Sequence, residues 1–313
     1  MNYLSCTGCK KKDFVYHRKY SGEKYCKKCF CTSIEKKVAR TVSKYQMLSS
    51  TDMIAVGLSG GKDSVVLTHL LNQMEKKFPN SRLVTVTIDE GIKNYREETI
   101  EIVNKITKDW NLENKLYSFK KEFGFSVDDI NQIIIERKLE LLPCTFCGVF
   151  RRKLLNQAAR DLEADKLAIG FNLDDEAQTI LMNFIRGDLG RIRRISPIPK
   201  KISPKFVPRI RPLREIPEKE IALYAYYKSL PIQSKECPYA FNSLRHNVQA
   251  SINLLEEKTP NVKFNILKNL HTINGLYQDS EANTIKNLND CETCGEPTNS
   301  KLCKACELVS MLE

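Results

Sequence analysis

Hydrophobic runs of two kinds alternate along residues 53–186. Short β-branched and aliphatic runs predict strands at residues 53–57, 83–89, 116–119 and 167–170. Apolar residues at helical spacing predict helices at residues 64–77, 97–110, 127–139, 147–162 and 174–186. This alternation is typical of a parallel sheet with helices on both faces, a doubly wound α/β fold. Ligands of such sheets bind beyond the carboxyl ends of the strands, so Gly57, Asp89 and Gly170 are expected to border one crevice.

The segments around this α/β region follow other patterns. Ile34, Val38 and Val42 share one face of a predicted helix over residues 32–48. Residues 186–214 hold ten Lys or Arg and one acid, which predicts an irregular basic loop. Residues 217–229 and 244–275 predict further helices. No apolar run approaches the roughly 18 residues that cross a bilayer, so we expect no transmembrane segment and no membrane partner.

The charge and the cysteine content narrow the choice of partner and compartment. Across 313 residues, 50 Lys and Arg against 38 Asp and Glu give a net charge of +12. Such a surplus attracts polyanions and makes nucleic acid the first partner to consider, although a basic surface can also serve solubility alone. Twelve cysteines without an apolar leader segment favour a reducing compartment, so the cytoplasm is the expected location.

Eight cysteines form two double C-x2-C patterns near the ends of the chain. The first set is Cys6, Cys9, Cys26 and Cys29, and the second is Cys291, Cys294, Cys303 and Cys306. Thiolates paired in this way hold one tetrahedral metal, so each set predicts a structural Zn²⁺ site. Zinc binding supplies on the order of 10 kcal/mol, enough to fold a module with little apolar content. Cys31 is an extra thiol that could replace Cys29 as a ligand or lie alone at the surface.

The segment SGGKDS, residues 59–64, connects a predicted strand to a predicted helix. Gly60 and Gly61 allow backbone N–H groups to approach phosphate oxygens at a helix N-terminus, where the potential favours anions. Lys62 adds a positive charge for phosphate, and Asp63 could hold Mg²⁺. The segment does not match the Walker pattern G-x-x-x-x-G-K-[ST], because an aspartate follows the lysine.

A second turn of this kind, IGFNLDDEAQT, occupies residues 169–179. Asp174 and Asp175 stand where a helix is predicted to begin. Aspartate is favoured there as an N-cap, because the first N–H groups of a helix lack partners. Two adjacent acids cannot both cap the helix.

A third C-x2-C pair, Cys144 and Cys147, lies inside the α/β region, and Cys237 is the remaining cysteine downstream. Three thiolates are one short of a closed zinc site. If they meet, they could hold an iron–sulfur cluster with one iron free for another ligand. The alternatives are a redox dithiol at the pair, a zinc with a fourth ligand such as His246, and an unliganded Cys237 in the core.

Several arginines are candidates for contact with phosphate. Arg151 and Arg152 follow the internal pair near a helix start, where cations are unfavourable unless an anion is close. They could face an activated phosphate, an RNA backbone or only solvent. Arg152 and the basic-loop residues Arg191, Arg193 and Arg194 are the residues predicted to bind the phosphates of a nucleic acid.

The order of these motifs resembles that of the PP-loop tRNA 2-thiouridine synthetases. This family includes archaeal and eukaryotic enzymes that thiolate the wobble uridine and the related T-loop uridine 2-sulfurtransferases. SGGKDS looks like the PP-loop of ATP pyrophosphatases, and residues 170–179 resemble the G-x-N-x-D-D-x-A-[EQ]-T segment of these enzymes. The resemblance covers nearly the whole chain. It implies a parallel, doubly wound ATP pyrophosphatase domain of the adenine nucleotide alpha hydrolase type, flanked by N- and C-terminal four-cysteine zinc modules.

The resemblance also implies how the chain is divided. The expected parts are an N-terminal zinc module at 1–31, a connecting helix at 32–50 and a PP-loop catalytic domain at 51–215. A helical region at 216–285 would complete that domain and contribute Cys237, and a C-terminal zinc module would occupy 286–313.

The activity implied by the resemblance is ATP-dependent 2-thiolation of a tRNA uridine. ATP would adenylate the C2 carbonyl, and sulfur would then come from a 4Fe-4S cluster held by Cys144, Cys147 and Cys237. The implied catalytic residues are Asp63, Arg151 and Asp175. The implied ATP-binding residues are Gly57, Ser59, Gly60, Gly61, Lys62, Asp63, Ser64, Ile88, Asp89, Gly170 and Asp175. The implied cofactors are ATP, Mg²⁺, the cluster and two Zn²⁺ ions.

Substrate, partners and rival functions remain open from the sequence. The wobble uridine is favoured over the T-loop uridine, because 22 Asn and 12 Cys are more thermolabile residues than strongly thermophilic proteins tend to keep. The implied partners are tRNA, a second copy in a homodimer and a sulfur donor, which could be sulfide, a persulfide or a ubiquitin-like thiocarboxylate carrier. The rivals are a PP-loop tRNA ligase of the lysidine-synthase type and a non-catalytic, zinc-dependent tRNA-binding subunit.

Overall fold

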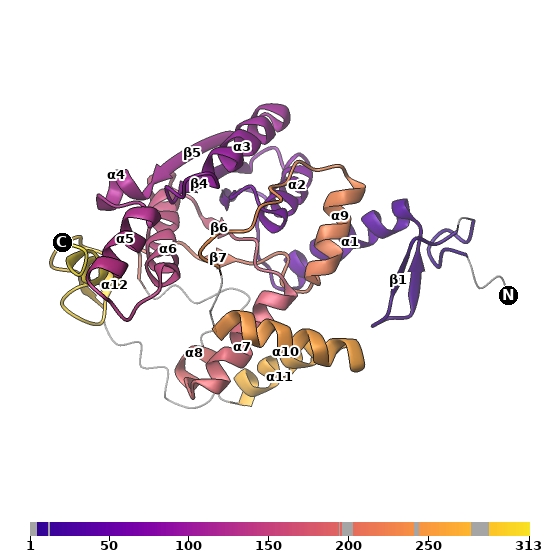
Figure 1. The fold of residues 1–313 in the computed structure, drawn as a ribbon. Helices are drawn as coiled ribbons and strands as arrows, with labels where there is room; N and C mark the ends of the chain where they lie inside the picture. The colour runs from indigo at the N-terminus through magenta and orange to yellow at the C-terminus, as the bar shows by residue number, and fades with distance from the viewer. Residues whose placement is uncertain (1–4, 12, 194, 196–202, 241–243, 277–287) are drawn as a thin grey trace.

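The centre of the molecule is a five-stranded parallel sheet (Figure 1). The computed structural model describes residues 5–11, 13–193, 195, 203–240, 244–276 and 288–313. In sheet order the strands are β5 (Glu113–Ser118), β4 (Arg82–Asp89), β3 (Met53–Gly57), β6 (Lys166–Ala168) and β7 (Arg209–Ile210). The prediction of a parallel α/β fold is confirmed.

The strand order reverses at β3. From β3 the chain adds β4 and then β5 on one side, and later adds β6 and β7 on the other side. β3 and β6 are therefore neighbours, with Val56 opposite Ala168. The loops that follow these two strands leave the sheet at the same edge, and such a reversal opens a crevice where ligands of doubly wound sheets bind.

Helices cover both faces of this sheet, and a two-stranded hairpin lies in each terminal region. Within the part of the chain that the structure describes, every helix is too short or too polar to cross a membrane. The helices are α1 (Lys27–Lys44), α2 (Lys62–Glu75), α3 (Arg96–Trp110), α4 (Phe119–Phe123), α5 (Val127–Glu136), α6 (Pro143–Asp161), α7 (Leu173–Ile185), α8 (Leu189–Arg193), α9 (Glu218–Tyr227), α10 (Leu244–Lys258), α11 (Val262–Leu276) and α12 (Lys304–Ser310). The hairpin strands are β1 (Tyr16–Arg18), β2 (Glu23–Tyr25), β8 (Asn289–Asp290) and β9 (Pro297–Thr298).

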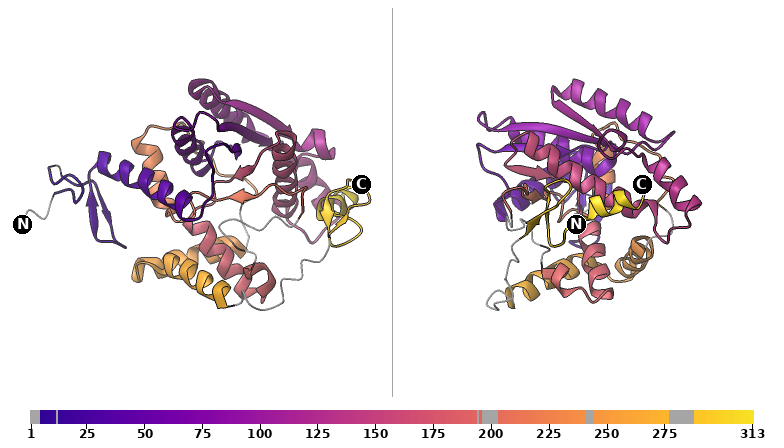
Figure 2. Two further views of the ribbon diagram at one scale, coloured as in Figure 1. Left: turned by 180° about the vertical axis from the view of Figure 1, so that it is seen from behind. Right: turned by 90° about the vertical axis from the view of Figure 1, so that its left-hand side faces the viewer.

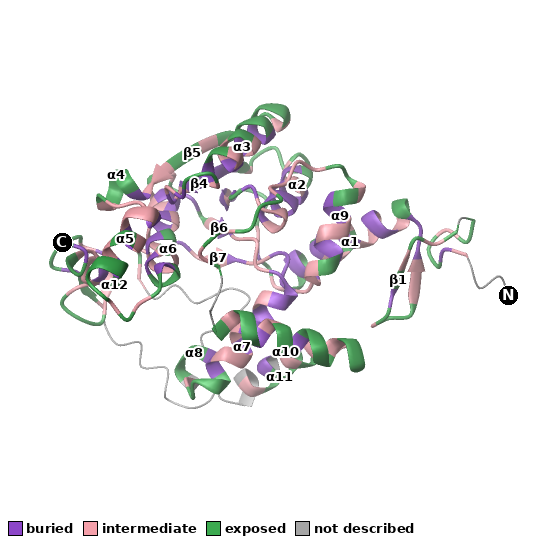
Figure 3. Cartoon of the chain, viewed as in Figure 1, coloured by how far each residue is buried: buried purple, intermediate pink, exposed green. Residues whose placement is uncertain are grey.

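Alternating side chains of the strands divide the core into two halves. Ile54 and Val56 pack with buried side chains of α1, α2 and α9. Ala55, between them, belongs to the other half, which contains buried side chains of α5, α6 and α12. This is the period of two that a strand covered on both faces must show. The outer faces of the covering helices are exposed (Figure 3).

Two predicted segments have a different structure. The basic segment 186–214 contains α8 and the edge strand β7, in which Arg209 pairs with Leu167 of β6. A strand of two residues carries too little pattern to be recognised in a sequence. The predicted helix over 244–275 is two helices, because Pro260 cannot continue a helix and Asn261 has a φ of +83°.

Several predicted boundaries also shift. α1 begins at Lys27, inside the first cysteine set, and not at residue 32. β5 begins at Glu113, before the predicted residue 116. α6 begins at Pro143, because proline is favoured at the first position of a helix. The internal cysteine pair therefore lies in the first turns of α6 and not in a loop before it.

The N-terminal and C-terminal modules lie at opposite ends of the molecule (Figures 1 and 2). In the C-terminal module, Leu308 and Leu312 are buried together with Phe150 and Leu154 of α6. In the N-terminal module, the buried Arg18 lies with its Nε 2.7 Å from Oε1 of Glu220 on α9. The hydroxyls of Tyr16 and Tyr20 donate to the same carboxylate. Each module is thus attached to the α/β domain by its own contact.

We expect Glu220→Ala to lower the free energy of unfolding by about 3–5 kcal/mol, because Arg18 would stay buried without its counter-ion. Urea denaturation would measure this loss. A matched control is Lys44→Ala, which removes a pair with Glu215 in which the lysine side chain is 59% exposed. That change should cost about 0–1 kcal/mol. Equal losses in the two variants would contradict the role of the buried pair.

Candidate active site

Hydrogen bonds of Ser64 and the conformation of Gly60 fix the shape of the loop between β3 and α2. The Ser64 hydroxyl accepts from the backbone N–H of Ser59 at 3.1 Å and donates to the Gly61 carbonyl at 2.9 Å. Gly60 has a φ of +80°, and a Cβ on it would lie 2.5 Å from Cγ2 of Thr99. A side chain is therefore excluded at this turn, and the backbone remains accessible at the N-terminus of α2.

Lys62 and Asp63 begin α2 and face other charged groups. Nζ of Lys62 lies 3.1 Å from Oδ2 of Asp63 and 2.7 Å from Oε1 of Glu218. Although burial opposes the charge on Lys62, the two carboxylates raise the pKa of its ammonium group. The lysine is thus held as a cation at the mouth of the loop, where a phosphate group could replace the carboxylates.

The second motif meets the first through Asn172. Its Nδ2 donates to Oδ1 of Asp63 at 2.8 Å. Its own side-chain oxygen caps α7 by accepting from the N–H of Asp175 at 2.9 Å, and the Asp175 carboxylate accepts in return from the Asn172 N–H. Asp175 therefore takes part in a capping box, the structural role considered for the two acids. Asp174 instead accepts from the backbone N–H of Glu218 at 2.8 Å and pairs with Lys263.

The two motifs are in backbone contact at Gly170. A Cβ on this glycine would lie 3.0 Å from the carbonyl carbon of Asp63 and 3.0 Å from the backbone nitrogen of Ser64. Any larger residue would push the end of β6 away from the start of α2. Gly57, at the end of β3, has more room, since its Cβ would meet Leu155 at 3.5 Å.

The end of β4 forms a third border of the crevice. Ile88 is buried, and its carbonyl accepts from Arg96, while Oδ1 of Asp89 accepts from the Gly91 N–H at 2.8 Å. A pocket of about 220 Å³ opens here, lined by Asp89, Gly91, Ile92, Lys93, Arg96, Glu97 and Ile100. A larger pocket of about 520 Å³ lies at the opposite ends of β4 and β5, and none of the motif residues line it. The smaller pocket is therefore the better candidate for a ligand site, because it borders the predicted ligand-binding residues.

The internal thiols gather at the start of α6. Sγ of Cys144 donates to the Tyr239 carbonyl at 3.0 Å, which brings it to the segment that contains Cys237. Sγ of Cys147 accepts from Nη2 of Arg151 at 3.1 Å. Burial, and next the charge of Cys237, raises the pKa of Cys144. Burial also raises the pKa of Cys147 to about 11, against the opposing charge of Arg151. The three thiols thus lie close enough for the charge of one to affect the pKa of another.

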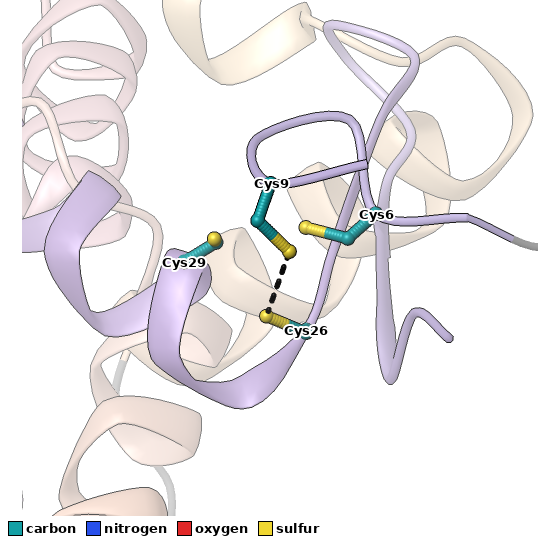
Figure 4. Close-up of side chains that lie close together, drawn as sticks. All are labelled: Cys6, Cys9, Cys26 and Cys29. Atoms are coloured by element: carbon teal, nitrogen blue, oxygen red, sulfur yellow. Dashed lines mark hydrogen bonds between the residues drawn. The ribbon is translucent and has the colours of Figure 1, made fainter. Parts of the chain in front are cut away.

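The terminal cysteines are packed more tightly than the internal ones. In each terminal set the four sulfurs lie within 4.8 Å of one another (Figure 4 shows the N-terminal set). The sulfurs of Cys9 and Cys26 are 3.9 Å apart, and those of Cys294 and Cys303 are 3.6 Å apart. A tetrahedral zinc with Zn–S bonds of about 2.3 Å requires about 3.8 Å between sulfurs. Both sets could therefore hold a metal ion of this kind.

A different metal group fits the internal thiols. Among the described residues, they do not form a set with all sulfurs within 4.8 Å. Each cysteine of an iron–sulfur cubane binds a different iron, so its ligand sulfurs must stand farther apart than around one zinc. The wider arrangement of three thiols, without a fourth, is compatible with a cluster that keeps one iron free.

The extra thiol Cys31 lies in neither set. It is buried on α1 in the core beside α9, and burial raises its pKa. The expectation of a surface thiol is therefore wrong, and Cys29, not Cys31, belongs to the four-cysteine set. The helical period that places Ile34 and Val38 inward also places Cys31 inward.

Positive charge gathers beside the internal thiols. Arg151, Arg152 and Arg191 are exposed. Partial desolvation by neighbouring residues, followed by the charges of Arg151 and Arg191, lowers the pKa of Arg152. Burial and then Arg152 lower the pKa of Arg209 to about 10. The side chain of Arg193 and all of Arg194 lie outside the described residues. Like charges held together at a surface are favourable only when an anion approaches.

Comparison with known proteins connects this arrangement to a family. The family model described as the PP-loop domain matches residues 31–252. The tRNA 2-thiolation protein NcsA of Haloferax volcanii is 38% identical, over 99% of this chain and 99% of its own length. The chain belongs to the PP-loop tRNA 2-thiolation family. Cytoplasmic tRNA 2-thiolation protein 1 of Danio rerio is 33% identical, over 99% of this chain and 88% of its own.

A solved structure of the same family supports the fold. It is the U34-tRNA thiolase NcsA from Methanococcus maripaludis with its 4Fe-4S cluster. It is 36% identical to this chain, covers 98% of it and 96% of the thiolase, and has a TM-score of 0.84. The predicted fold class, with a PP-loop domain between two four-cysteine groups, is therefore confirmed.

Four polar residues that contact the site of this protein were not among the site residues predicted from the sequence. They are Glu90, Asn172, Glu218 and Arg245. Glu90 and Asn172 adjoin predicted residues, so their position after a strand was an available signal. Glu218 and Arg245 belong to no motif, and only the tertiary fold brings them to the loop.

We expect Gly170→Ala to weaken ATP binding at least about tenfold and to lower stability by about 1–3 kcal/mol, because the added methyl group must separate β6 from the start of α2. Isothermal titration with ATP and urea denaturation would measure the two effects. Gly190→Ala is the control, since its Cβ would meet Oδ1 of Asp188 at an ordinary 3.6 Å. Unchanged nucleotide affinity in Gly170→Ala would contradict the close approach.

Asp175 should contribute a measurable pH dependence to stability. Burial raises its pKa to about 6, above the value of about 3.9 in an unfolded chain. The folded state therefore binds this proton more tightly, and the resulting stability is present at low pH and is lost as the pH rises through 6. Between pH 5 and pH 8 the loss is about 1 kcal/mol. Asp175→Asn should lack this part of the slope in urea unfolding of the nucleotide-free protein, and identical slopes would contradict it.

Proposed function

We propose that this protein is an ATP-dependent tRNA uridine 2-sulfurtransferase. The observation that carries the proposal is the short path between the phosphate loop and the thiols. Arg96 reaches the Ser59 carbonyl and Glu90, Glu90 pairs with Arg151, and Arg151 donates to Cys147. An activated base held over the loop would thus lie near a sulfur-handling group.

In the first half of the reaction, O2 of the uracil attacks the α-phosphorus of ATP and pyrophosphate leaves. Gly60, Gly61 and Ser64 would present backbone and hydroxyl groups to the pyrophosphate, and Lys62 would balance its charge. Asp63 and Asp175 converge through Asn172, so their carboxylates would hold Mg²⁺. The remaining nucleotide contacts would come from Gly57, Ser59, Ile88, Asp89 and Gly170.

In the second half, a sulfur nucleophile attacks C2, the C2–O bond breaks and AMP leaves. Cys144, Cys147 and Cys237 would hold a 4Fe-4S cluster, whose free iron supplies a position for sulfide. Arg151, beside Cys147, would stabilise the negative charge that develops on the departing phosphate. The structural relative carries such a cluster, which supports this assignment.

The exposed arginines and the terminal modules would bind the tRNA. Arg152 and Arg191, together with Arg193 and Arg194, would contact tRNA phosphates. The two modules, each with one Zn²⁺, would extend this surface from opposite ends. We further propose that the boundaries between the parts of the chain lie after residues 31, 50, 215 and 285, as the family resemblance implies.

The wobble uridine is the favoured target, and the T-loop uridine is the second candidate. The similar thiolase from Methanococcus maripaludis is named for U34, the wobble position. We further propose a cytoplasmic location, a homodimer and a sulfide, persulfide or thiocarboxylate donor. The name of the Danio rerio relative supports the location.

Metal analysis of protein purified without oxygen tests the cluster. We expect about four irons with acid-labile sulfide, and about two zincs, in the wild type. Cys237→Ala should lose the iron and keep the zinc. Cys31→Ala is the matched control, because it removes a buried thiol outside the three sets and should keep both metals. Zinc without iron in the wild type would refute the cluster assignment.

An assay with tRNA separates thiolation from the rival functions. We expect Cys144→Ala to lose 2-thiouridine formation by more than about a hundredfold while tRNA-dependent AMP or adenylated tRNA still forms. An amine-attaching ligase would keep its product in this variant, since ligation needs no cysteine. A binding subunit would bind tRNA and ATP without any tRNA-dependent cleavage of ATP.

A further inference from the structure

A buried carboxylate lies between the two halves of the site. Glu90 follows β4, and its side chain is 4% exposed. One oxygen, Oε1, lies 2.8 Å from Nη2 of Arg151, and the other, Oε2, lies 2.9 Å from Nε of Arg96. An uncompensated carboxylate at this depth would be strongly unfavourable, so the two arginines and Glu90 must be ordered together.

The contact with Glu90 fixes where Arg151 can go. The Arg151 side chain is 47% exposed and would otherwise sample many rotamers. Its Nη2 carries two hydrogens, which can serve the Glu90 carboxylate and the Cys147 sulfur at 3.1 Å together. Arg152, the next residue, carries the same charge and disfavours an unanchored Arg151. Glu90 therefore supplies the only carboxylate found paired with Arg151 among the described residues.

The second arm of Glu90 leads to the phosphate loop. Arg96 is buried at the start of α3, and it donates to the Ile88 carbonyl and, at 3.4 Å, to the Ser59 carbonyl. Any displacement of Glu90 is thus transmitted to a backbone group of the loop as well as to a thiol. Among the described residues, no other carboxylate pairs with both Arg96 and Arg151.

We propose that Glu90 is a positioning residue for sulfur transfer: it holds Arg151 against the Cys147 sulfur and, through Arg96, keeps that pair in register with the phosphate loop. This proposal rests on the proposed function, because its object is the thiol group that would carry the cluster. Glu90 does not touch the substrate, so its effect on the reaction passes through Arg151 and Arg96.

The first test is a double-mutant cycle on the rate of sulfur transfer. Glu90→Gln keeps the shape of the side chain but loses its charge. At saturating ATP and tRNA, we expect E90Q to slow single-turnover thiolation at least about tenfold, with KM for tRNA changed less than about twofold. In an Arg151→Gln background the same change should slow the reaction at least about threefold less, because the contact with Arg151 is already absent and only the contact with Arg96 remains. Equal slowing in both backgrounds would overturn the proposal.

The second test needs no tRNA. Hydrogen bonds to cluster sulfurs tune the reduction potential, and so does the charge of Glu90 itself. That charge acts equally in the wild-type and the Arg151→Gln backgrounds. The difference between the E90Q shifts in these two backgrounds therefore isolates the part that passes through the arginine. EPR-monitored titration of the anaerobic holoprotein would measure it. We expect the two shifts to differ, and equal shifts would overturn the proposal.

Controls separate positioning from loss of structure. Glu220→Gln also removes the charge of a buried carboxylate that pairs with an arginine, but it does so at the N-terminal module. It should lower the free energy of unfolding without changing the reduction potential of the cluster. If Arg151→Gln loses iron, Arg151→Met, which also lacks the positive charge, provides the second background. Loss of iron in E90Q alone would overturn the proposal, since Glu90 would then act on cluster assembly. The E90Q shifts in reduction potential could differ between the two backgrounds although the wild type never thiolates tRNA. That result would refute the proposed function and leave the positioning role of Glu90 intact.

Discussion

The site depends on the close approach of two backbones at the strand reversal. β3 and β6 are neighbours, and Gly170 lies so close to the start of α2 that a Cβ on it would be 3.0 Å from the backbone of Asp63 and of Ser64. Only with this contact can Asn172 reach Asp63 and join the two motifs. The parallel sheet sets the spacing of its strand ends, and glycine removes the one side chain that would prevent the loops from meeting.

The remaining parts of the molecule serve this junction by different physical means. The α/β core is held by apolar packing on both faces of the sheet. The terminal modules have little apolar content, and paired thiols replace the missing core. Between these parts lie the thiols of α6 and the buried Glu90, where the cost of burying charged groups is offset by pairing them with arginines.

The sequence predicted the elements whose signals are local. Strands β3, β4 and β6 follow from apolar runs, and the cysteine sets follow from spacing alone. The edge strand β7 was missed because two residues between prolines carry no period. Glu218 and Arg245 were missed for a different reason: their partners lie far away in the sequence, and no local pattern records a contact made by folding.

These distant partners have a consequence for how the protein is made. Lys62 meets Glu218, and Asp175 meets Arg245, so the phosphate loop emerges from the ribosome about 150 residues before its partner on α9. Until α9 has been synthesised, the charged side chains of the loop are exposed to water. A nascent chain that ends before α9 would carry the motif without the Glu218 carboxylate that pairs with Lys62 in the folded protein.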